Sequence, residues 1–259
     1  MKVELISYTQ NPIQQMYLAA TRCVTAGEVK PSDPETMERV VEKCLNAGHL
    51  TVAEFVDFTF SIEGITRSCS HQLVRHRHAS FCQMSERRVK IGTPEEYSMV
   101  RNTIDDVSPI SWPKEETTKI IEKYFSITCN DNELKQAIMD SLFVRFCDYW
   151  ELIQCGLSVE QARAVLPECT LTNLYMHVNF RALIEMAKLR LCGKAELEIR
   201  QLFQLIRLNI GYLMGDTINP EGEFLRKFLQ PKCIWLGKCN EAKPCGVYKW
   251  EKLGKEESQ

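Results

Sequence analysis

The clearest local pattern in the chain is an alternation of apolar and polar side chains over residues 55–63. Apolar side chains stand at Val56, Phe58, Phe60 and Ile62, and polar ones at Asp57, Thr59, Ser61 and Glu63. A period of two residues places each set on one face of a β-strand. The pattern therefore predicts a strand in a sheet that is covered on one face only. β-prone segments at 3–8 and 170–178 predict two further strands.

Helix start signals recur in the first third of the chain. Asn11-Pro12 and Ser32-Asp33-Pro34 each place a capping residue before a first-turn proline. They predict helices that run to about Cys23 and to Asn46. After Gly64, where we expect the chain to turn, Ile65, Cys69 and Leu73 recur at i, i+4 and i+8. This spacing predicts a helix with these three side chains towards the core.

The second half of the chain is predicted to be mainly helical. Residues 89 to about 111 contain Gly92, Pro94 and Pro109 and are expected to be irregular. Helices are expected over 115–125 and from Asn130-Asp131 to about Cys155, the second with an apolar stripe of Leu134, Ile138, Leu142, Phe146 and Tyr149. A short helix should follow the capping box of Ser158 and Gln161. Further helices are expected after Asn179, over 195–214 and, lastly, from Pro220. No repeat or linker divides the chain, so we expect one domain of mixed α and β structure.

Composition and charge exclude several classes of protein. The chain has 259 residues, 44% of them apolar, which is enough for a substantial core. Its net charge of −2 argues against a general nucleic-acid or membrane-surface binder. The first residues hold no apolar signal segment, and no run approaches the length of a membrane span. We therefore expect a cytoplasmic protein without membrane or nucleic-acid partners.

The twelve cysteines are scattered, and no pair has CxxC spacing. Free thiols in a reducing compartment are expected. Cys233, Cys239 and Cys245 hint at zinc, but the usual two-to-four-residue chelating gap is missing and no histidine is near. We therefore predict no metal site.

The most unusual stretch is residues 75–88, which holds four arginines and two of the five histidines. Its only acid is Glu86. Arg67, His71 and Arg75 form a cationic stripe at helical spacing that leads into it. A solvated basic helix end would explain the charge, because repulsion within the stripe and attraction to the helix dipole roughly cancel. The alternative is a pocket for a phosphate and a planar heterocycle, since arginine forks and serine hydroxyls suit phosphate oxygens.

The detailed spacing favours the pocket. Arg75-His76-Arg77, followed after seven residues by Ser85, with Ser80 and Arg87, resembles the signature of flavin-dependent thymidylate synthases. Other segments are similar to family segments and stand in family order: 48–49, 58–60, 72–77, 162–167, 178–181, 189–192 and 198–200. The resemblance covers roughly residues 1–230. It implies a single α+β domain over 1–230, with a central mixed or antiparallel sheet flanked by long helices, followed by a cysteine-containing extension over 231–259.

The resemblance also implies an activity. The family makes dTMP from dUMP, with methylene-tetrahydrofolate as carbon donor, NADPH as reductant and a tightly held FAD. It is homotetrameric, and each active site is assembled from more than one subunit. The family lacks an enzymatic cysteine nucleophile, although Cys169, near arginines in sequence, suits the other thymidylate synthase class, which uses one.

Residue roles follow from the matching positions. The dUMP-contacting positions are Gln72, Arg75, Gln83, Met84, Ser85, Glu86, Arg87, Arg163 and Arg190. Among these, Arg190 matches the catalytic residue proposed to stabilise the uracil ring as an anion at N3. The FAD-contacting positions are Thr51, Arg75, His76, Arg77, His78, Gln83, Asn179, Phe180, Arg181 and Glu185. His49 matches a histidine near the flavin.

Several positions depart from the family pattern. Arg88 stands where many relatives have tyrosine, and Gln83 where some have glutamate. Glu185 stands at a position where an uncharged residue is expected beside the flavin, and Lys194 stands where some relatives have histidine. Lys194 and Glu185 could compensate each other. These departures keep open a repurposed relative that binds flavin and a nucleotide without making thymidylate, and a nucleic-acid module remains a second alternative.

Bland structural roles are also open for single residues. Arg163 could simply cap helix carbonyls, and Arg181 could pair with Glu185 at i, i+4. His49 and His71 could be satisfied core histidines.

Overall fold

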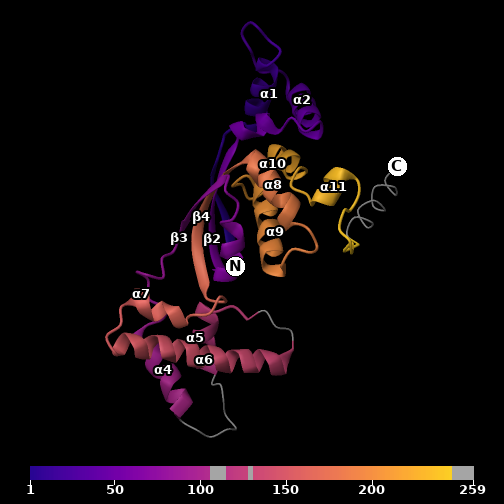
Figure 1. The fold of residues 1–259 in the computed structure, drawn as a ribbon. Helices are drawn as coiled ribbons and strands as arrows, with labels where there is room; N and C mark the ends of the chain where they lie inside the picture. Colours follow the sequence, from indigo (N-terminus) through magenta and orange to yellow (C-terminus); the bar gives the residue numbers. More distant parts are fainter. Residues whose placement is uncertain (106–114, 128–130, 247–259) are drawn as a thin grey trace. The chain divides into compact units, whose positions relative to one another are not determined.

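Four strands form one antiparallel sheet in the order β1-β2-β4-β3. Their bounds are β1 Lys2–Tyr8, β2 Asp57–Thr66, β3 Ala79–Gln83 and β4 Leu171–Asn179. The structure is a computed structural model and describes residues 1–105, 115–127 and 131–246 (Figure 1). The expected α+β class with an antiparallel sheet is confirmed.

Contacts divide the chain into two units that are each discontinuous in sequence. The first comprises Met1–Ile62, Gln72–Cys82 and Tyr175–Gln259, and the second comprises Glu63–His71 and Gln83–Leu174. Strands β2 and β4 each have residues in both units. The expected division into a domain over 1–230 and an extension over 231–259 stays a prediction.

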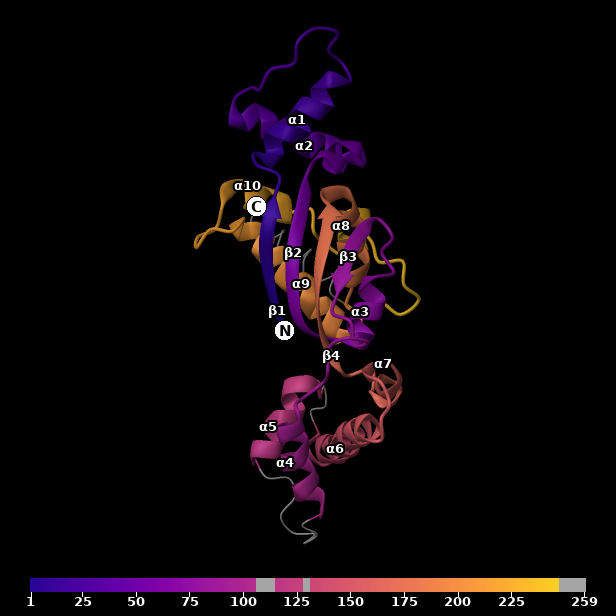
Figure 2. The ribbon, with the colours of Figure 1, turned by 90° about the vertical axis from the view of Figure 1, so that its left-hand side faces the viewer.

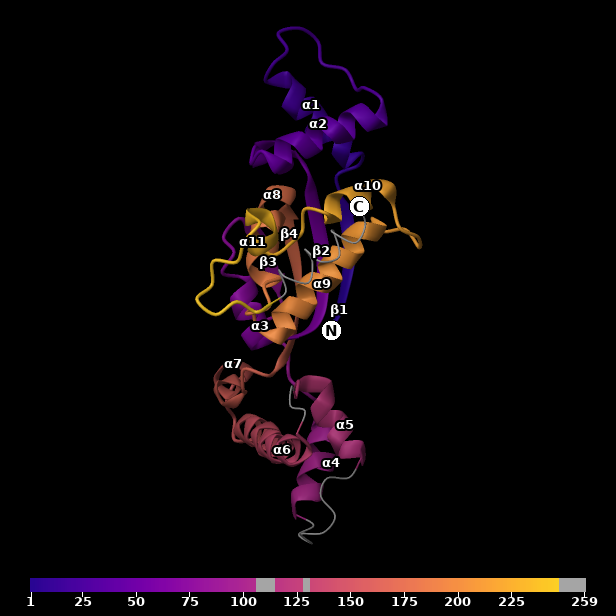
Figure 3. The ribbon, with the colours of Figure 1, turned by 90° about the vertical axis from the view of Figure 1, so that its right-hand side faces the viewer.

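The alternating pattern of residues 55–63 has the predicted consequence. Val56, Phe58, Phe60 and Ile62 are fully buried, whereas Glu63 is exposed. In the first unit, α8 (Phe180–Arg190) and α9 (Leu197–Tyr212) cover one face of the sheet, which Figure 3 shows in front and Figure 2 behind. Figure 2 looks onto the opposite, uncovered face. The one-sided cover is confirmed.

The turn predicted at Gly64 is wrong. Gly64 has a φ of +68° and lies inside β2, which continues to Thr66. The helix that follows, α3 (Arg67–Leu73), is therefore shorter than expected and excludes Ile65. Ile65, Cys69 and Leu73 are nevertheless all fully buried. The helical spacing selected the correct core residues because a strand residue and two helix residues face inwards together.

The first unit also contains the remaining N- and C-terminal helices. They are α1 Pro12–Arg22, α2 Pro34–Asn46, the 3-10 turn η1 Leu50–Phe55, α10 Pro220–Arg226 and α11 Lys232–Leu236. Helix α11 follows the helix that was expected to be the last. It packs against α8 (Figure 3).

Two of the three caps expected in this unit are present. Asp33 accepts a hydrogen bond from the Thr36 amide at 2.9 Å, and Asn179 accepts one from the Ala182 amide at 2.8 Å. Asn11 is different, because it has a φ of +49° and its side chain makes no capping bond. Pro12, whose fixed φ suits a first turn, begins α1 without that cap.

The second unit is mainly helical, as expected. It contains α4 Pro94–Asp105, α5 Glu115–Tyr124, α6 Asn132–Gln154, the one-turn α7 Val159–Ala162 and the 3-10 turn η2 Arg163–Val165. The predicted Asp131 cap and the Ser158–Gln161 capping box are confirmed. Of the stripe on α6, Leu142, Phe146 and Tyr149 are buried, but Leu134 is 59% exposed and Ile138 39% exposed. Only the C-terminal part of the predicted stripe is therefore buried by other described residues.

Helix α4 occupies a segment that was expected to be irregular. Thr93 and Glu96 form a reciprocal cap, in which the Glu96 amide donates to Thr93 Oγ1 and the Thr93 amide to Glu96 Oε2. Pro94 therefore begins a helix instead of breaking one. Residues 106–111 of that segment, and Asn130, lie outside the described residues. Within the described parts of the chain, no helix is long and apolar enough to cross a membrane.

A glycine sets the packing of α10 on α9. A Cβ added at Gly222 would lie 2.8 Å from the Gly211 carbonyl oxygen and closer still to that of Ile210. We expect Gly222→Ala to lower the free energy of unfolding by about 3 kcal/mol, because rigid backbone cannot move aside. Urea unfolding measures the change. Gly27→Ala, where a Cβ meets nothing within 4 Å, is the control, and an equal loss there would contradict the explanation.

Candidate functional site

The basic stretch, residues 75–88, consists of a turn, a strand and a second turn. Gln72, just before it, lies near the end of α3; residues 75–78 form the first turn, and residues 79–83 form β3. A second turn over 84–89 is closed by hydrogen bonds from the amides of Arg88 and Val89 to the Ser85 carbonyl, at 3.0 and 2.9 Å. The alternative considered from sequence, a solvated basic helix end, is therefore wrong for most of this stretch, because the stretch forms turns and a strand.

The predicted site residues fall into two groups, one in each unit. The first unit holds Gln72, Arg75, His76, Arg77, His78, Asn179, Phe180, Arg181, Glu185 and Arg190, together with Thr51 and His49. The second holds Gln83, Met84, Ser85, Glu86, Arg87 and Arg163. Each group is described within its own unit.

A cavity of about 940 Å³ lies in the first unit. Its lining includes seven of the ten predicted flavin positions: Arg75, His76, Arg77, His78, Asn179, Arg181 and Glu185. Residues from η1, from the turn after α3, from the end of β4, from α8 and from α11 thus converge on one space. Of the other positions in this unit, Thr51 and His49 are exposed, and Phe180 is fully buried in the core against Phe58. None of these three lines the cavity, and their roles stay predictions.

The cavity lining carries more positive than negative charge. Five cations line it, Arg75, Arg77, Arg181, Lys188 and Lys232, against the acids Glu54 and Glu185. Arg181 pairs with Glu54 at 2.5 Å, and Lys188 with Glu185 at 2.7 Å. The two pairings considered from sequence, Arg181 with Glu185 and Lys194 with Glu185, are not the ones observed. The remaining surplus of cations suits an anionic ligand.

Arg190 is held by two residues from the end of α3 and the turn after it. Its Nε donates to His76 Nε2 at 2.9 Å, one Nη donates to the Gln72 carbonyl oxygen at 3.0 Å, and the other to Gln72 Oε1 at 3.4 Å. The Gln72 side-chain amide also contacts Glu196. The structure thus brings together Gln72, His76 and Arg190, three residues that were predicted separately.

Burial and the contact with Arg190 together disfavour the protonated form of His76. Burial, followed by the positive charge of Arg190, lowers the pKa of His76 from its ordinary 6.5 to about 4. The ring is therefore neutral at pH 7. Because Nε2 accepts the hydrogen bond from Arg190, the remaining ring proton is on Nδ1.

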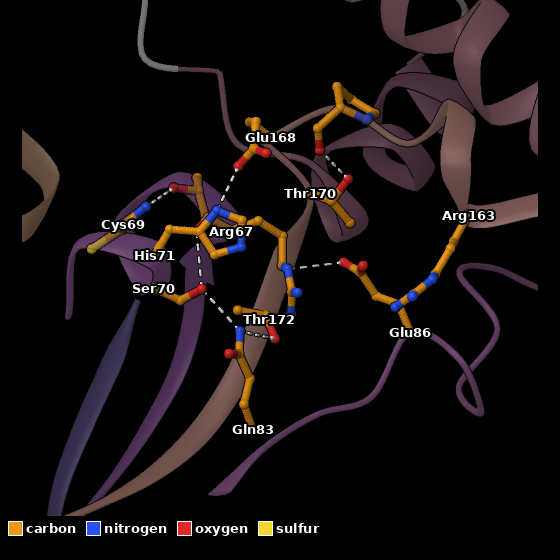
Figure 4. Close-up of polar contacts among 12 residues, drawn as sticks. Arg67, Cys69, Ser70, His71, Gln83, Glu86, Arg163, Glu168, Thr170 and Thr172 are labelled. Atoms are coloured by element: carbon orange, nitrogen blue, oxygen red, sulfur yellow. Dashed lines mark hydrogen bonds and ion pairs between the residues drawn. The ribbon is translucent and has the colours of Figure 1, made fainter. Parts of the chain in front are cut away.

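In the second unit, Gln83 is bonded to two buried hydroxyl groups (Figure 4). Its Nε2 donates to Ser70 Oγ at 2.9 Å and to Thr172 Oγ1 at 3.2 Å. The Ser70 hydroxyl uses its own proton on the Arg67 carbonyl at 2.9 Å, so it can only accept from Gln83. The side-chain amide is therefore oriented, with its NH₂ towards the hydroxyls and its oxygen turned away from them.

Glu86 is engaged by an arginine of its own unit. Its Oε1 lies 3.4 Å from Arg67 Nε, and the side chains are 10% and 20% exposed, respectively (Figure 4). Two members of the cationic stripe predicted from sequence are therefore each paired with an acid: Arg67 with Glu86, and His71, whose Nδ1 lies 3.3 Å from a carboxylate oxygen of Glu168. His71 is exposed and is not a core histidine.

Arg87 and Arg163 meet at a residue that sequence reasoning missed. Arg87 Nε lies 2.6 Å from a carboxylate oxygen of Glu160, and Arg163 Nε donates to the Glu160 backbone carbonyl at 3.2 Å. The bland role considered for Arg163, capping a helix carbonyl, is therefore observed. Glu160 precedes Arg163 by one helical turn, and that spacing was the available signal.

The cysteines show no sign of a reactive thiolate or a metal site in the described parts of the chain. Burial raises the pKa of the half-buried Cys169 thiol, which disfavours a nucleophile. Burial, with smaller contributions from Cys239, Cys192 and Cys245, raises the pKa of Cys233. No group of three described His, Cys, Asp or Glu side chains could hold a metal ion. The absence of a metal stays a prediction.

The cavity, with its surplus of cations, is a candidate site for an anionic ligand within an α+β fold. Arg190 does not line the cavity but is bonded to His76, which does. Residues 4–210 match the family model described as thymidylate synthase complementing protein. Curated flavin-dependent thymidylate synthases of Pyrococcus horikoshii and Pyrococcus furiosus are 33% and 31% identical to the chain, covering 93% and 99% of it and 90% and 99% of their own lengths.

A solved structure shares the fold at lower sequence identity. The flavin-dependent thymidylate synthase ThyX of Helicobacter pylori, crystallised with FAD and dUMP, is 19% identical with a TM-score of 0.68, over 89% of this chain and 100% of that one. The chain therefore belongs to the family of flavin-dependent thymidylate synthases.

The hydrogen bond between Gln83 and Ser70 can be tested by a double-mutant cycle. We expect Ser70→Ala and Gln83→Ala to be coupled by about 1 kcal/mol in urea unfolding, because each change removes the same buried bond. Ser98→Ala, which removes a hydroxyl bonded within α4, is the matched partner in a control cycle and should be additive with Gln83→Ala. Coupling of equal size in both cycles would rule out a specific contact.

The lowered pKa of His76 predicts a pH dependence of stability. The unfolded chain binds a proton at His76 below about pH 6.5, whereas the folded chain does so only near pH 4. Stability from this group is thus present above pH 6.5 and is lost as pH falls towards 4. Because the ring is only half-buried, we expect a loss of about 1–2 kcal/mol. His76→Gln, compared with the wild type by urea unfolding at each pH, should remove this part of the slope.

Proposed function

We propose that this chain converts dUMP to dTMP by FAD-dependent reductive methylation, with methylene-tetrahydrofolate as carbon donor and NADPH as reductant. The observation that carries the proposal is the cavity in the first unit, which gathers Arg75, His76 and Arg77 of the family signature with Arg181 of α8. Family membership supports the same reaction. The enzyme would be a methyltransferase of nucleotide biosynthesis.

The cavity has the properties that a flavin dinucleotide requires. Its volume of about 940 Å³ lies within the roughly 300–1,000 Å³ typical of small-molecule and cofactor sites. After the two ion pairs with Glu54 and Glu185, Arg75, Arg77 and Lys232 remain as a surplus of positive charge for a pyrophosphate. Bound FAD would supply hydride transfer, which no amino-acid side chain provides.

Arg190 is suited to act on the pyrimidine ring. It stays protonated at every pH of interest, so it can stabilise negative charge that develops on the uracil without losing its own proton. Gln72 and His76 hold its guanidinium group by three hydrogen bonds. His76 is neutral, so it positions the arginine without adding a second charge beside it.

Arg87 and Arg163 are proposed to bind the phosphate of dUMP, with Ser85. In the structure Arg87 is paired with Glu160, and the two side chains are 60% and 51% exposed. Such an exposed pair is worth at most about 1 kcal/mol. A phosphate dianion, which forms stronger charged hydrogen bonds with arginine, can therefore replace the carboxylate.

Two features of the chain weaken the alternative of a repurposed relative. The carboxylate of Glu185, which departs from the family pattern, is neutralised by Lys188 on the same helix. The raised pKa of Cys169 fits a reaction without a cysteine nucleophile. We also propose a cytoplasmic homotetramer with active sites shared between subunits, a state that the resemblance to the family supports and that light scattering of the purified protein would test.

Activity of two variants tests the mechanism. We expect Arg190→Ala to lower kcat/KM for dTMP formation by roughly 100-fold or more, because the group that stabilises the ring anion is removed. Cys169→Ala should retain activity within about threefold. The assay contains enzyme, FAD, NADPH, methylene-tetrahydrofolate and dUMP, and dTMP is measured by chromatography. Loss of activity in Cys169→Ala with flavin still bound would overturn the assignment.

A further inference from the structure

Strand β3 ends at Gln83, the first residue of the segment 83–87 that is predicted to bind dUMP. Two hydroxyl groups of the same unit lie on one side of its side-chain amide. Ser70 of α3 is 2.9 Å from Gln83 Nε2, and Thr172 of β4 is 3.2 Å from it. Ser70 is fully buried and Thr172 nearly so, whereas Gln83 is partly exposed. The amide is therefore anchored in the interior by a residue that itself reaches the surface.

The hydrogen bonds of Gln83 leave its side chain with one function to offer a ligand. Ser70 donates its own proton to the Arg67 carbonyl, so its oxygen can only accept from the amide. The two hydroxyl oxygens match the two protons of the NH₂ group. The amide oxygen Oε1 makes no hydrogen bond to any described residue (Figure 4). Gln83 therefore presents an acceptor and no donor, as a glutamate in its place would.

We propose that Ser70 and Thr172 are positioning residues for substrate binding, which engage the NH₂ group of Gln83 and so fix its Oε1 as an acceptor for a donor group of dUMP. The inference rests on the proposed function, since it takes Gln83 to contact dUMP. Without the two hydroxyls the amide would be free to turn and present its NH₂ group instead.

The polarity of Oε1 restricts which part of dUMP it contacts. An ionised phosphate has only acceptor oxygens, and an amide oxygen beside them has no proton to share. The contact is therefore with the nucleoside part of the substrate. Two donor groups are present there, the 3′-hydroxyl of the sugar and the N–H at N3 of the uracil ring.

Calorimetric titration of the FAD-loaded enzyme with dUMP tests the proposal. Ser70→Ala and the isosteric Thr172→Val each remove one hydroxyl, and we expect each to raise the Kd for dUMP roughly three- to tenfold, the effect of one weakened hydrogen bond. Thr172→Ser keeps the hydroxyl and should bind dUMP within twofold of the wild type. Ser98→Ala, which removes a hydroxyl bonded within α4, is the matched control and should also stay within twofold.

A second background separates positioning from a merely structural role. In Gln83→Met the amide is absent, so adding Thr172→Val should change the Kd for dUMP no further. An equal effect of Thr172→Val with and without the amide would overturn the inference, because the hydroxyl would then act by another route.

Two substrate analogues identify the donor group. The monophosphate of 2′,3′-dideoxyuridine lacks the sugar hydroxyl, and 3-methyl-dUMP lacks the ring N–H. Thr172→Val should leave the Kd unchanged for the analogue without the contacted group and raise it for the other. Equal weakening of dUMP and both analogues, or unchanged dUMP binding in Ser70→Ala and Thr172→Val, would overturn the inference with the proposed function intact. Failure of the wild type to bind dUMP would overturn the proposed function as well, so the two failures are distinguishable.

Discussion

The hydrogen bonds that Arg190 makes to His76 and Gln72 are the interaction on which the site in the first unit depends. They join the C-terminal end of α8 to the end of α3 and the turn after it, two segments that are more than 100 residues apart in sequence. A guanidinium group needs acceptors, and an imidazole nitrogen supplies one only while the ring is neutral. Burial and the charge of Arg190 both lower the pKa of His76, so the ring stays neutral and remains an acceptor for Arg190.

Much of the fold could be predicted from sequence because local signals and burial agreed. The alternation in β2, the Asp33 and Asn179 caps and the Ser158–Gln161 box each act over a few residues, and each was found. Prediction failed where a residue type that often interrupts secondary structure instead begins or lies within an element. Pro94 was taken for a breaker but begins α4, and Gly64 was taken for a turn but lies within β2.

The predicted site residues were only partly accessible to such reasoning. The family signature identified Arg75, His76, Arg77 and His78 in the cavity wall, which follow one another in a short stretch. It missed Ser70, Thr172 and Glu160, which act through contacts that only the fold creates. A buried hydroxyl that orients an amide has the sequence signature of any other serine or threonine, so its role becomes visible only from hydrogen-bond distances.

If Arg87 binds the phosphate of dUMP, as proposed, that phosphate has to replace the carboxylate of Glu160 as the partner of the Arg87 guanidinium. An uncharged nucleoside offers Arg87 nothing better than the partner it has, whereas a doubly negative monophosphate does. Discrimination between a nucleotide and its nucleoside would then come from an internal competitor as well as from direct attraction. A residue outside the family signature would in this way help the enzyme reject uridine-type nucleosides that share the same ring.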